Sequence, residues 1–441
     1  MFIYFVGIKG SGMSALATIM HDRGNIVSGS DVEKVFFTDE KLNSLGIKVE
    51  SLAAPVPKDA DLIVLGNAFA DDHPQVVEAK QLGIEVIRYY DFLNQFAKSN
   101  QHSIAVAGTN GKTTTTSMIV SMLQSQKPSY LIGDGNGFGN ANDDTFVFEA
   151  CEYKNTFYNY HPEYAIINNV EMDHPDFFKD LDDVVNTFQT FASNSQNVII
   201  NMDDAPSMRL KETGNTFYYF SINSTEADMY MQNINKTAAG FDFDLYFQKQ
   251  LLGNFSLPFY GDHMIQNTLS SLLVGHLIGH DMEMLIADLS QFGGAKRRFE
   301  KYPLDEKRNI TMIDDYAHHP TAIKLTIDAV RQQYPNRKVT VLFQPHTYSR
   351  TIEFLDEFAQ TLVAADSLYL APIFGSIREQ KGEITIDTLK DKVIELNSEI
   401  LINDINEIDA SLNDQIICLL GAGDIDKIYI PKIKKIFEEQ L

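Results

Sequence analysis

The chain has 441 residues, with 36 Lys and Arg against 60 Asp and Glu and a formal net charge of -24. This length predicts about two to four domains, and the acidic balance argues against a general role in binding nucleic acid or a membrane surface, although local Lys and Arg can still line a pocket for an anionic substrate. Two cysteines, no basic leader and no apolar run near the ~20 residues of a membrane span predict a cytoplasmic protein without a disulfide framework.

The N-terminal segment has the pattern of a strand, a glycine-rich loop, a helix and a second strand. Residues 2–8 form an apolar run, small and apolar residues follow at helical spacing, and a second apolar run ends at Gly29. The pattern resembles the start of a Rossmann sheet, in which a loop lysine favours a diphosphate and an acid after the second strand binds ribose. A purely structural turn is the alternative. The candidate substrate residues are Gly7, Lys9, Gly10, Ser11, Gly12, Met13, Ser30 and Asp31.

Further strands and helices complete a predicted first domain over residues 1–100. Asn67 directly follows one of these strands, at the edge where open α/β sheets bind ligands, so it is a candidate substrate residue. The polar segment 98–102 marks the domain boundary. The expected strands are 61–65 and 84–87, and the expected helices are 38–45 and 74–82.

The strongest motif follows this boundary. An apolar run over 103–107 predicts a buried strand, which leads through a glycine-rich turn into a helix. These parts make a phosphate cradle, because backbone N–H groups and a helix N-terminus favour an anion, Lys112 adds a charge and Thr113 offers a hydroxyl to Mg²⁺. The loop is a shortened Walker pattern, and an ordinary turn that opens a helix is the alternative. The cradle comprises Gly108, Thr109, Asn110, Gly111, Lys112, Thr113 and Thr114.

Polar residues follow two buried strands of the same domain. The apolar run 146–149 ends in Glu149, and the run 164–169 leads to His174. Because both residues lie where a parallel strand ends, they are candidates to lie beside the cradle and hold Mg²⁺. Mg²⁺ prefers oxygen ligands, so a His ligand is unusual, and a helix cap or a solvated loop is the alternative for each residue. The glycine-rich segment 133–139 is predicted as a flexible turn and not as a site.

The rest of this domain, predicted to span 101–294, contains a β insert and a long helix. Aromatic and polar residues alternate from about 215 to 260, after a strand at 198–201, and predict an antiparallel insert with one solvated face. A helix begins near Gly261. On it, Asn267 either reaches a nucleotide base or lies on the helix surface.

A charged hinge at 293–299 leads into a predicted third domain, 295–441. Its adjacent Arg297 and Arg298 either meet phosphate or are solvated. Strands and helices alternate after it, which predicts a third parallel sheet. Three of these strands lead into polar segments that begin at Asp314, Gln344 and Gly421, and three on one edge indicate a surface that faces a ligand. The expected strands are 309–314, 338–344, 367–372 and 414–420, and the expected helices are 320–334, 352–364 and 425–439.

Five segments together resemble the Mur ligase family of peptidoglycan synthesis. They are GTNGKTTTT, FEACEY, NNVEMDHPD, GGAKRRF and DDYAHHPTA, and with the N-terminal GIKGSGMS and GSD the resemblance runs through all three predicted domains. The segments GIKGSGMS, GSD and FQPHTYSRT single out one member of that family. The resemblance implies an α/β fold of three domains: an N-terminal Rossmann-like domain that binds a UDP-sugar, a central P-loop ATPase-type parallel sheet with a β insert, and a C-terminal Rossmann-like ligase domain.

The resemblance also implies roles for individual residues. The cradle then binds ATP, with Thr113 and Glu149 on Mg²⁺ and His174 as a second metal-site residue. The chain departs from the family at Asn110, where relatives often carry His, and at Thr347, where some carry Arg; the second departure leaves the contacts to substrate anions open. The implied nucleotide contacts are Asn267, Arg298 and Asp315, the implied catalytic groups are Lys112, His318, His346 and Arg350, and the further substrate contacts are Tyr316, His346 and Arg350.

The implied activity is an ATP-dependent ligation. It joins L-alanine to the lactyl carboxylate of UDP-N-acetylmuramate through an acyl phosphate, and the chain is expected to be a monomer or a homodimer. Three alternatives stay open. They are a recycling ligase that adds a preformed murein tripeptide to UDP-N-acetylmuramate, a nucleotide-regulated binding protein without ligase activity, and a dehydrogenase that uses the N-terminal glycine loop.

Overall fold

The structure is a computed structural model that describes residues 1–375, 382–403, 405, 408 and 412–438. The chain forms two compact units, and each is described by itself. The predicted domain boundaries at 100 and 294 stay predictions. The first unit comprises residues 1–170, 184–230 and 268–292, and the second comprises 171–183, 231–267 and 293–441.

The N-terminal part of the first unit is a five-stranded parallel sheet with the order β3-β2-β1-β4-β5. Parallel strands are buried on both faces, which explains the unbroken apolar runs of β1 and β4. The predicted strand, glycine loop, helix and strand are therefore confirmed. The strands are β1 (Phe2–Val6), β2 (Ile26–Asp31), β3 (Lys48–Ser51), β4 (Leu62–Leu65) and β5 (Glu85–Arg88), and the helices are α1 (Ser11–Asp22), α2 (Asp39–Ser44), α3 (Pro74–Gln81) and α4 (Tyr89–Lys98).

A second sheet of the first unit carries the phosphate cradle. Its strands follow the order β12-β11-β10-β6-β9-β7-β8, and all neighbours pair in parallel except β7 with β8. The cradle connects β6 to α5, as predicted. The strands are β6 (His102–Ala107), β7 (Ser129–Leu131), β8 (Gly137–Phe138), β9 (Thr145–Glu149), β10 (Tyr164–Ile167), β11 (Asn197–Asn201) and β12 (Thr216–Ser221).

The helices around this sheet and the β insert complete the middle of the chain. The prediction of an antiparallel insert is confirmed for β14 and β15, but it is wrong for β12, which pairs in parallel with both β11 and β13. In β14, buried Phe241, Phe243 and Leu245 alternate with the more exposed Asp242 and Asp244, as the sequence pattern indicates. The bounds are β13 (Met229–Thr237), β14 (Gly240–Phe247), β15 (Gln250–Leu257), α5 (Lys112–Met122), α6 (Leu181–Ser193), α7 (Asp262–Leu277), α8 (Met282–Leu289), and the 3-10 helices Tyr153–Asn159 and Ser207–Arg209.

The segment 133–139, predicted as a flexible turn, is instead partly a strand packed on α1. Its last residues form β8, and an added Cβ at Gly137 would lie 2.3 Å from the backbone oxygen of Ala15, while one at Gly139 would lie 2.3 Å from that of Ile19. The two glycines are therefore required by the close approach of two backbones. The prediction failed because the helix that covers this segment lies more than a hundred residues earlier in the sequence.

Replacing Gly137 by alanine should lower the free energy of unfolding by about 1–3 kcal/mol, because backbone atoms have to move to admit the methyl group. The measurement is urea-induced unfolding of the full chain. Gly293→Ala is the matched control, since a Cβ there has nothing within 4 Å and the residue has no positive φ. Equal unfolding midpoints for the two variants would contradict the packing described above.

The third sheet belongs to the second unit and has the order β16-β17-β21-β18-β19-β20. The predicted parallel sheet is confirmed, with one addition: β16 is an antiparallel edge strand that pairs with β17. The strands are β16 (Glu300–Asp305), β17 (Ile310–Asp315), β18 (Lys338–Phe343), β19 (Ser367–Leu370), β20 (Leu401–Asn403) and β21 (Gln415–Leu420), and the helices are α9 (Pro320–Gln333), α10 (Tyr348–Glu353), α11 (Leu355–Leu362), α12 (Ile386–Leu396) and α13 (Ile425–Glu438).

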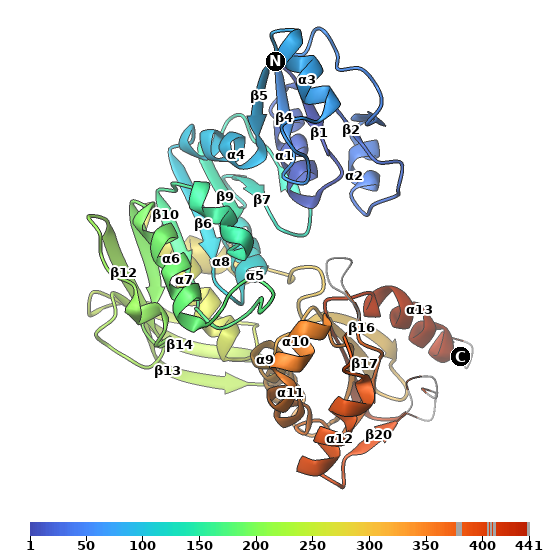
Figure 1. Cartoon of the computed structure of the whole chain (residues 1–441). Coiled ribbons are helices and arrows are strands. Elements are labelled where there is room, and N and C mark those ends of the chain that lie inside the picture. Colours follow the sequence, from blue (N-terminus) through green and yellow to red (C-terminus); the bar gives the residue numbers. More distant parts are fainter. Residues whose placement is uncertain (376–381, 404, 406–407, 409–411, 439–441) are drawn as a thin grey trace. The chain divides into compact units, whose positions relative to one another are not determined.

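Helices cover both faces of this third sheet (Figure 1). In β21, Ile416 and Cys418 pack with α9, α11 and α12 on one face, while Ile417 and Leu419 pack with α13 on the other. This is the alternation of side chains that a buried parallel strand requires. With both faces covered, the polar ends of the strands are the part of the sheet left to meet a ligand.

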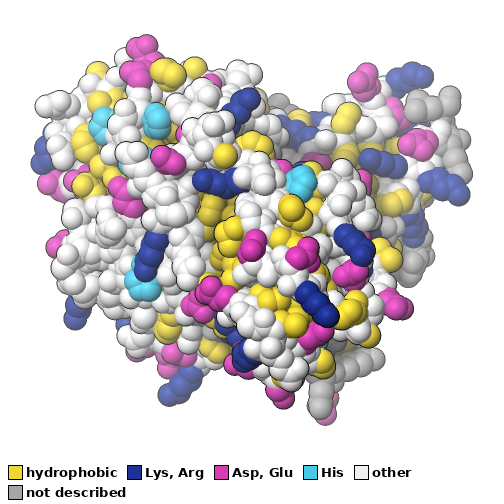
Figure 2. Space-filling model, turned by 90° about the horizontal axis from the view of Figure 1, so that it is seen from above, with side chains coloured by type: hydrophobic (Ala, Val, Ile, Leu, Met, Phe, Trp, Pro, Cys, Tyr) yellow, Lys and Arg dark blue, Asp and Glu magenta, His cyan; other side chains and the backbone are white. Residues whose placement is uncertain are grey.

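The surface mixes charges of both signs. On the face in Figure 2, Asp and Glu side chains lie interspersed with Lys and Arg, so the acidic excess does not gather into a single patch on that face. Among the helices of the described residues, none combines the length and the apolar character needed to cross a bilayer.

Candidate active site

The glycine loop after β1 is tied to the end of β2. The backbone N–H groups of Gly7 and Ile8 donate to the carbonyl of Ser30 at 2.8 and 3.2 Å. Gly7 has a φ of 85°, and an added Cβ would lie 2.4 Å from the ring of Phe69, so only glycine fits there. The loop is thereby held at the carboxyl ends of the parallel strands, where the sequence analysis expected it.

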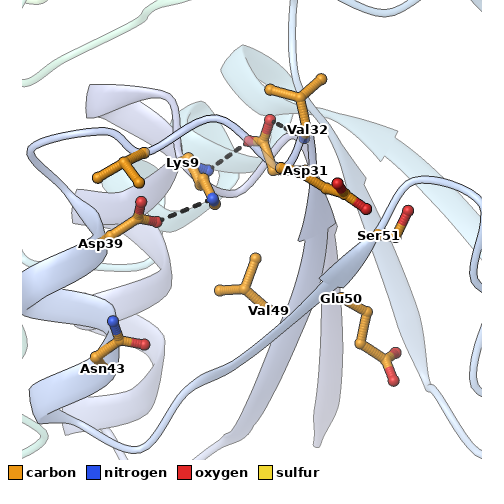
Figure 3. Close-up of a pocket in the computed structure, with 10 residues that line it drawn as sticks. Lys9, Asp31, Val32, Asp39, Asn43, Val49, Glu50 and Ser51 are labelled. Atoms are coloured by element: carbon orange, nitrogen blue, oxygen red, sulfur yellow. Dashed lines mark hydrogen bonds and ion pairs between the residues drawn. The ribbon is translucent and has the colours of Figure 1, made fainter.

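Lys9 and Asp31, both predicted, meet at a cavity of about 400 Å³ beside this loop (Figure 3). The Lys9 backbone N–H donates to the Asp31 carboxylate at 2.7 Å, and the Lys9 ammonium lies 3.2 Å from Asp39. The cavity is also lined by Asp39, Asn43 and Glu50 from α2 and β3, which could not be predicted from the sequence because no motif marks them.

The other predicted substrate residues have different settings. The buried hydroxyl of Ser30 donates to Gln75 at 2.6 Å, and Met13 is buried, so both belong to the packed interior. Gly10, Ser11 and Gly12 lie at the start of α1, where a Cβ at Gly12 would lie 2.5 Å from the hydroxyl oxygen of Tyr89. Asn67 is exposed, just after β4.

The phosphate cradle has the backbone that the motif predicts. Gly108 and Gly111 have φ values of 139° and 81°, which other residues rarely adopt. The loop is braced by Asn169 after β10: its carbonyl accepts from the Thr109 N–H at 3.0 Å and its side-chain oxygen accepts from the Asn110 N–H at 2.8 Å. The brace is made through the backbone of Asn110, so the side chain at this position matters little to it.

Lys112 lies against its own loop and against Glu152. Its ammonium donates to the carbonyl of Gly108 at 2.6 Å and to both carboxylate oxygens of Glu152 at 3.0 Å. Burial lowers the pKa of Lys112, but the acidic groups around it, Glu152 foremost, together outweigh burial and the pKa is raised. The ammonium is therefore held charged. The role of Glu152 as the partner of Lys112 was missed, although it lies in the FEACEY segment.

Thr113 and Glu149 come together, as predicted. The Thr113 hydroxyl donates to a carboxylate oxygen of Glu149 at 3.0 Å, and the Gly133 backbone N–H donates to the same oxygen at 3.0 Å. A hydroxyl and a carboxylate are ligands that Mg²⁺ accepts. Within the described ranges, no set of three or more His, Cys, Asp or Glu is placed to hold a metal.

Several predicted groups of the second unit meet around Asp173, a residue that the sequence analysis missed. Arg350 donates to one oxygen of the Asp173 carboxylate through Nε at 3.0 Å and Nη2 at 2.7 Å, and both side chains are buried. Burial would raise the pKa of Asp173, but Arg350 holds it well below its usual range. His174, with a φ of 53°, follows Asp173 and lies 3.9 Å from the second oxygen of that carboxylate.

The two predicted histidines of this cluster have assigned tautomers. The Nδ1 of His318 lies 2.9 Å from the carbonyl of Tyr316 and therefore donates, which leaves Nε2 as the accepting nitrogen. The Nδ1 of His346 lies 3.2 Å from Nη1 of Arg350 and therefore accepts. Burial and Arg350 lower the pKa of His318 well below its usual value, so its imidazole is neutral near pH 7. The two rings meet edge to face, with centroids 6.0 Å apart.

The predicted nucleotide contacts of the second unit flank this cluster. Asp315 accepts from the backbone N–H groups of Phe299 and Ala317, both at 2.9 Å, and burial raises its pKa although Arg298 acts in the opposite direction. The guanidinium of Arg298 lies 4.7 Å from the ring centre of Tyr316. Asn267 is buried on α7. Six of the predicted residues therefore lie in one unit, and they come from the hinge, from the end of β17 and from the start of α10 with the loop before it. They are Arg298, Asp315, Tyr316, His318, His346 and Arg350.

Comparison with known proteins gives matches to one family along nearly the whole chain. Three family models match: the Mur ligase family catalytic domain over residues 2–101, the Mur ligase middle domain over 106–275, and the Mur ligase glutamate ligase domain over 297–424. The chain is 42% identical to a UDP-N-acetylmuramate–L-alanine ligase of Limosilactobacillus reuteri over 436 residues, 99% of each sequence.

Solved structures agree in fold over the same extent. A UDP-N-acetylmuramate-alanine ligase of Thermotoga maritima has a TM-score of 0.77 and 25% identity and covers 100% of this chain and 99% of its own. A murein peptide ligase of Psychrobacter arcticus has a TM-score of 0.66 and 22% identity, with 99% of both chains covered. The three-domain α/β fold predicted from the sequence is confirmed by these matches.

Proposed function

This chain belongs to the Mur ligase family, and we propose on that premise that it is an ATP-dependent ligase that joins L-alanine to the lactyl carboxylate of UDP-N-acetylmuramate. The observation that carries the substrate assignment is the 42% identity, over almost the whole length of both chains, to a UDP-N-acetylmuramate–L-alanine ligase. The tripeptide-adding alternative is less well supported, because the murein peptide ligase is a more distant match.

The reaction has two steps with different demands. A carboxylate oxygen of UDP-N-acetylmuramate attacks the γ-phosphorus of ATP and ADP leaves, which gives an acyl phosphate. The amine of L-alanine then attacks the acyl carbon, phosphate leaves and the amine loses a proton. Because the first step brings two anions together, it needs cationic and N–H partners around the transferred phosphoryl group.

The cradle and Lys112 meet the demand of the first step. Its backbone N–H groups and a permanently charged ammonium stand at the start of α5, where an anion is favoured. We assign Thr113 and Glu149 to Mg²⁺, which when bound would offset phosphate charge, with His174 as a further candidate ligand. Asn267, Arg298 and Asp315 are assigned to the nucleotide.

The cluster around Asp173 suits the second step. Arg350 is fixed by its carboxylate partner and would face the acyl phosphate as a rigid cation, and His346 is oriented by Arg350. Nε2 of neutral His318 is an acceptor for the amine proton.

The N-terminal cavity is assigned to the UDP-sugar. Lys9 provides a cation for the diphosphate, and Asp31 provides an acceptor for a hydroxyl or an N–H group. Because Gly7 has no side chain, the backbone of the loop can approach the diphosphate closely. The other predicted substrate residues of the N-terminal sheet surround this loop or follow β4, whereas Tyr316, His346 and Arg350 belong to the second unit. Both the nucleotide and the sugar substrate are cytoplasmic metabolites, so we place the reaction in the cytoplasm, and the state of assembly is predicted to be a monomer or a homodimer.

A phosphate-release assay tests the proposal. Phosphate should appear only when UDP-N-acetylmuramate, ATP and L-alanine are all present, and glycine, L-serine or a preformed tripeptide should support much slower release. Release that needs no amino acid would favour a nucleotide-regulated binding protein, and release with the tripeptide alone would favour the recycling ligase. Binding of NAD(H) in place of ATP would favour a dehydrogenase.

A further inference from the structure

The guanidinium of Arg297 in the hinge contacts four residues at one edge of the third sheet. Its Nε donates to Asp314 at 3.2 Å, its Nη2 donates to the carbonyl of Gly421 at 2.6 Å, and its Nη1 lies 3.4 Å from the carbonyl of Gly423 and 3.3 Å from Asp426. The side chain is 13% exposed. One guanidinium therefore joins the end of β17, the loop after β21 and the first turn of α13.

The backbone around Arg297 is strained and tied to the same strand end. Arg297 and Phe299 have φ values of 55°, which side-chain-bearing residues adopt at a cost of about 1–2 kcal/mol each. The carbonyl of Arg297 accepts from the Tyr316 N–H at 2.8 Å, and the Phe299 N–H donates to Asp315 at 2.9 Å. Such a conformation persists only where the surroundings determine it.

The two neighbouring arginines consequently have different settings. Arg298 lies between the two strained residues, and its guanidinium is over the ring of Tyr316, 4.7 Å from the ring centre. The guanidinium of Arg297 lies 5.3 Å from the same ring centre, but it also reaches the buried carboxylate of Asp314, which is 1% exposed. The residue pattern left both arginines as either phosphate contacts or solvated residues, and the resemblance assigned Arg298 alone to the nucleotide; in the structure Arg297 binds carbonyl and carboxylate oxygens of its own unit.

We infer that Arg297 is a positioning residue, which fixes Arg298, Asp315 and Tyr316 in the arrangement that receives the nucleotide. The inference rests on the proposed function, because it takes Arg298 and Asp315 as nucleotide contacts. It predicts that positioning requires the planar guanidinium of Arg297 with its several donors, and not merely a positive charge. A lysine ammonium cannot reach two carbonyls and a carboxylate in this planar arrangement.

The test combines amide hydrogen exchange with equilibrium binding of a non-hydrolysable ATP analogue and of UDP-N-acetylmuramate. Arg297→Lys should speed exchange at the Phe299 and Tyr316 amides and weaken binding of the ATP analogue by about tenfold, with UDP-N-acetylmuramate binding unchanged. Because Arg297 acts in part through Arg298, the loss of analogue binding in the pair Arg297→Lys and Arg298→Met should be smaller than the sum of the two single losses. Lys296→Met, an exposed hinge charge, is the matched control and should leave all readouts unchanged.

Three results would overturn the inference. Unchanged amide exchange in Arg297→Lys would show that Arg297 does not hold the segment around Phe299 and Tyr316 in place. Unchanged binding of the ATP analogue would show that holding this segment in place does not contribute to nucleotide binding. Additive losses in the double variant would show that Arg297 contacts the nucleotide directly. If Arg297→Lys does not fold, Asp426→Asn removes one partner and should shift exchange and binding in the same direction by less; no shift would also overturn it. A wild-type chain that binds no ATP analogue refutes the proposed function, and the exchange result still decides the role of Arg297.

Discussion

Lys112→Ala is expected to lower ATP-dependent ligation by about a thousandfold or more, while the chain still folds and binds UDP-N-acetylmuramate. The lysine supplies the fixed positive charge of the cradle, and no uncharged side chain can offset the charge that develops on the transferred phosphoryl group. The measurement is phosphate release at saturating substrates, together with equilibrium binding of UDP-N-acetylmuramate. Turnover near that of the wild type would remove the cradle from the mechanism.

A second variant separates loss of chemistry from loss of stability. Lys112→Ala removes the ammonium that pairs with the carboxylate of Glu152, which is 2% exposed, and the loss of the cation of a buried ion pair is destabilising. Adding Glu152→Gln removes the carboxylate charge and should restore much of the unfolding free energy without restoring ligation. If the double variant regained activity, the loss in Lys112→Ala would have been one of folding.

Arg350→Met is expected to lower the free energy of unfolding by about 3–5 kcal/mol and to abolish ligation. The substitution leaves the Asp173 carboxylate buried without the guanidinium that holds its pKa well below its usual range. The double variant Arg350→Met and Asp173→Asn should recover part of the stability and none of the activity. Urea-induced unfolding and phosphate release are the two measurements.

A surface ion pair of the same unit is the control for this prediction. Lys324 lies 2.7 Å from Asp328 on α9, with 66% and 52% of the two side chains exposed. Lys324→Met should therefore change the free energy of unfolding by less than about 1 kcal/mol and leave ligation intact. If Arg350→Met and Lys324→Met lowered the free energy of unfolding by comparable amounts, burial would not make the Arg350–Asp173 pair more important for stability than a surface pair.

The sequence alone was sufficient for the parts of the fold that local patterns encode. The strand and glycine loop before α5, the parallel strands and the polar strand ends all follow from apolar runs, turn residues and their order, and they are confirmed. The edge strand β16 was missed because Pro303 interrupts it, next to an irregular register with β17. The parallel pairing of β12 was missed because the run of aromatic residues resembles the antiparallel insert that follows it.

The partners within the candidate sites could not be read in the same way. Lys112 and Glu152 are 40 positions apart, and Asp173 and Arg350 are 177 positions apart. Each residue stands in a segment that the motifs identified, yet a motif does not say which charge of one segment meets which charge of another. That pairing depends on the three-dimensional order of the strands, which places the ends of distant segments side by side.

The glycines of segment 133–139 have a consequence for any attempt to isolate the N-terminal hundred residues. Helix α1 is covered on one side by β7 and β8, and Arg23 at its end donates to the carbonyl of Asn140 at 2.9 Å. A fragment of the N-terminal hundred residues would therefore expose to solvent the side of α1 that β7 and β8 cover in the full chain. The part of the chain that carries the cavity beside Lys9 and Asp31 is thus not a detachable module, and a truncation boundary has to be chosen from spatial neighbours and not from the sequence.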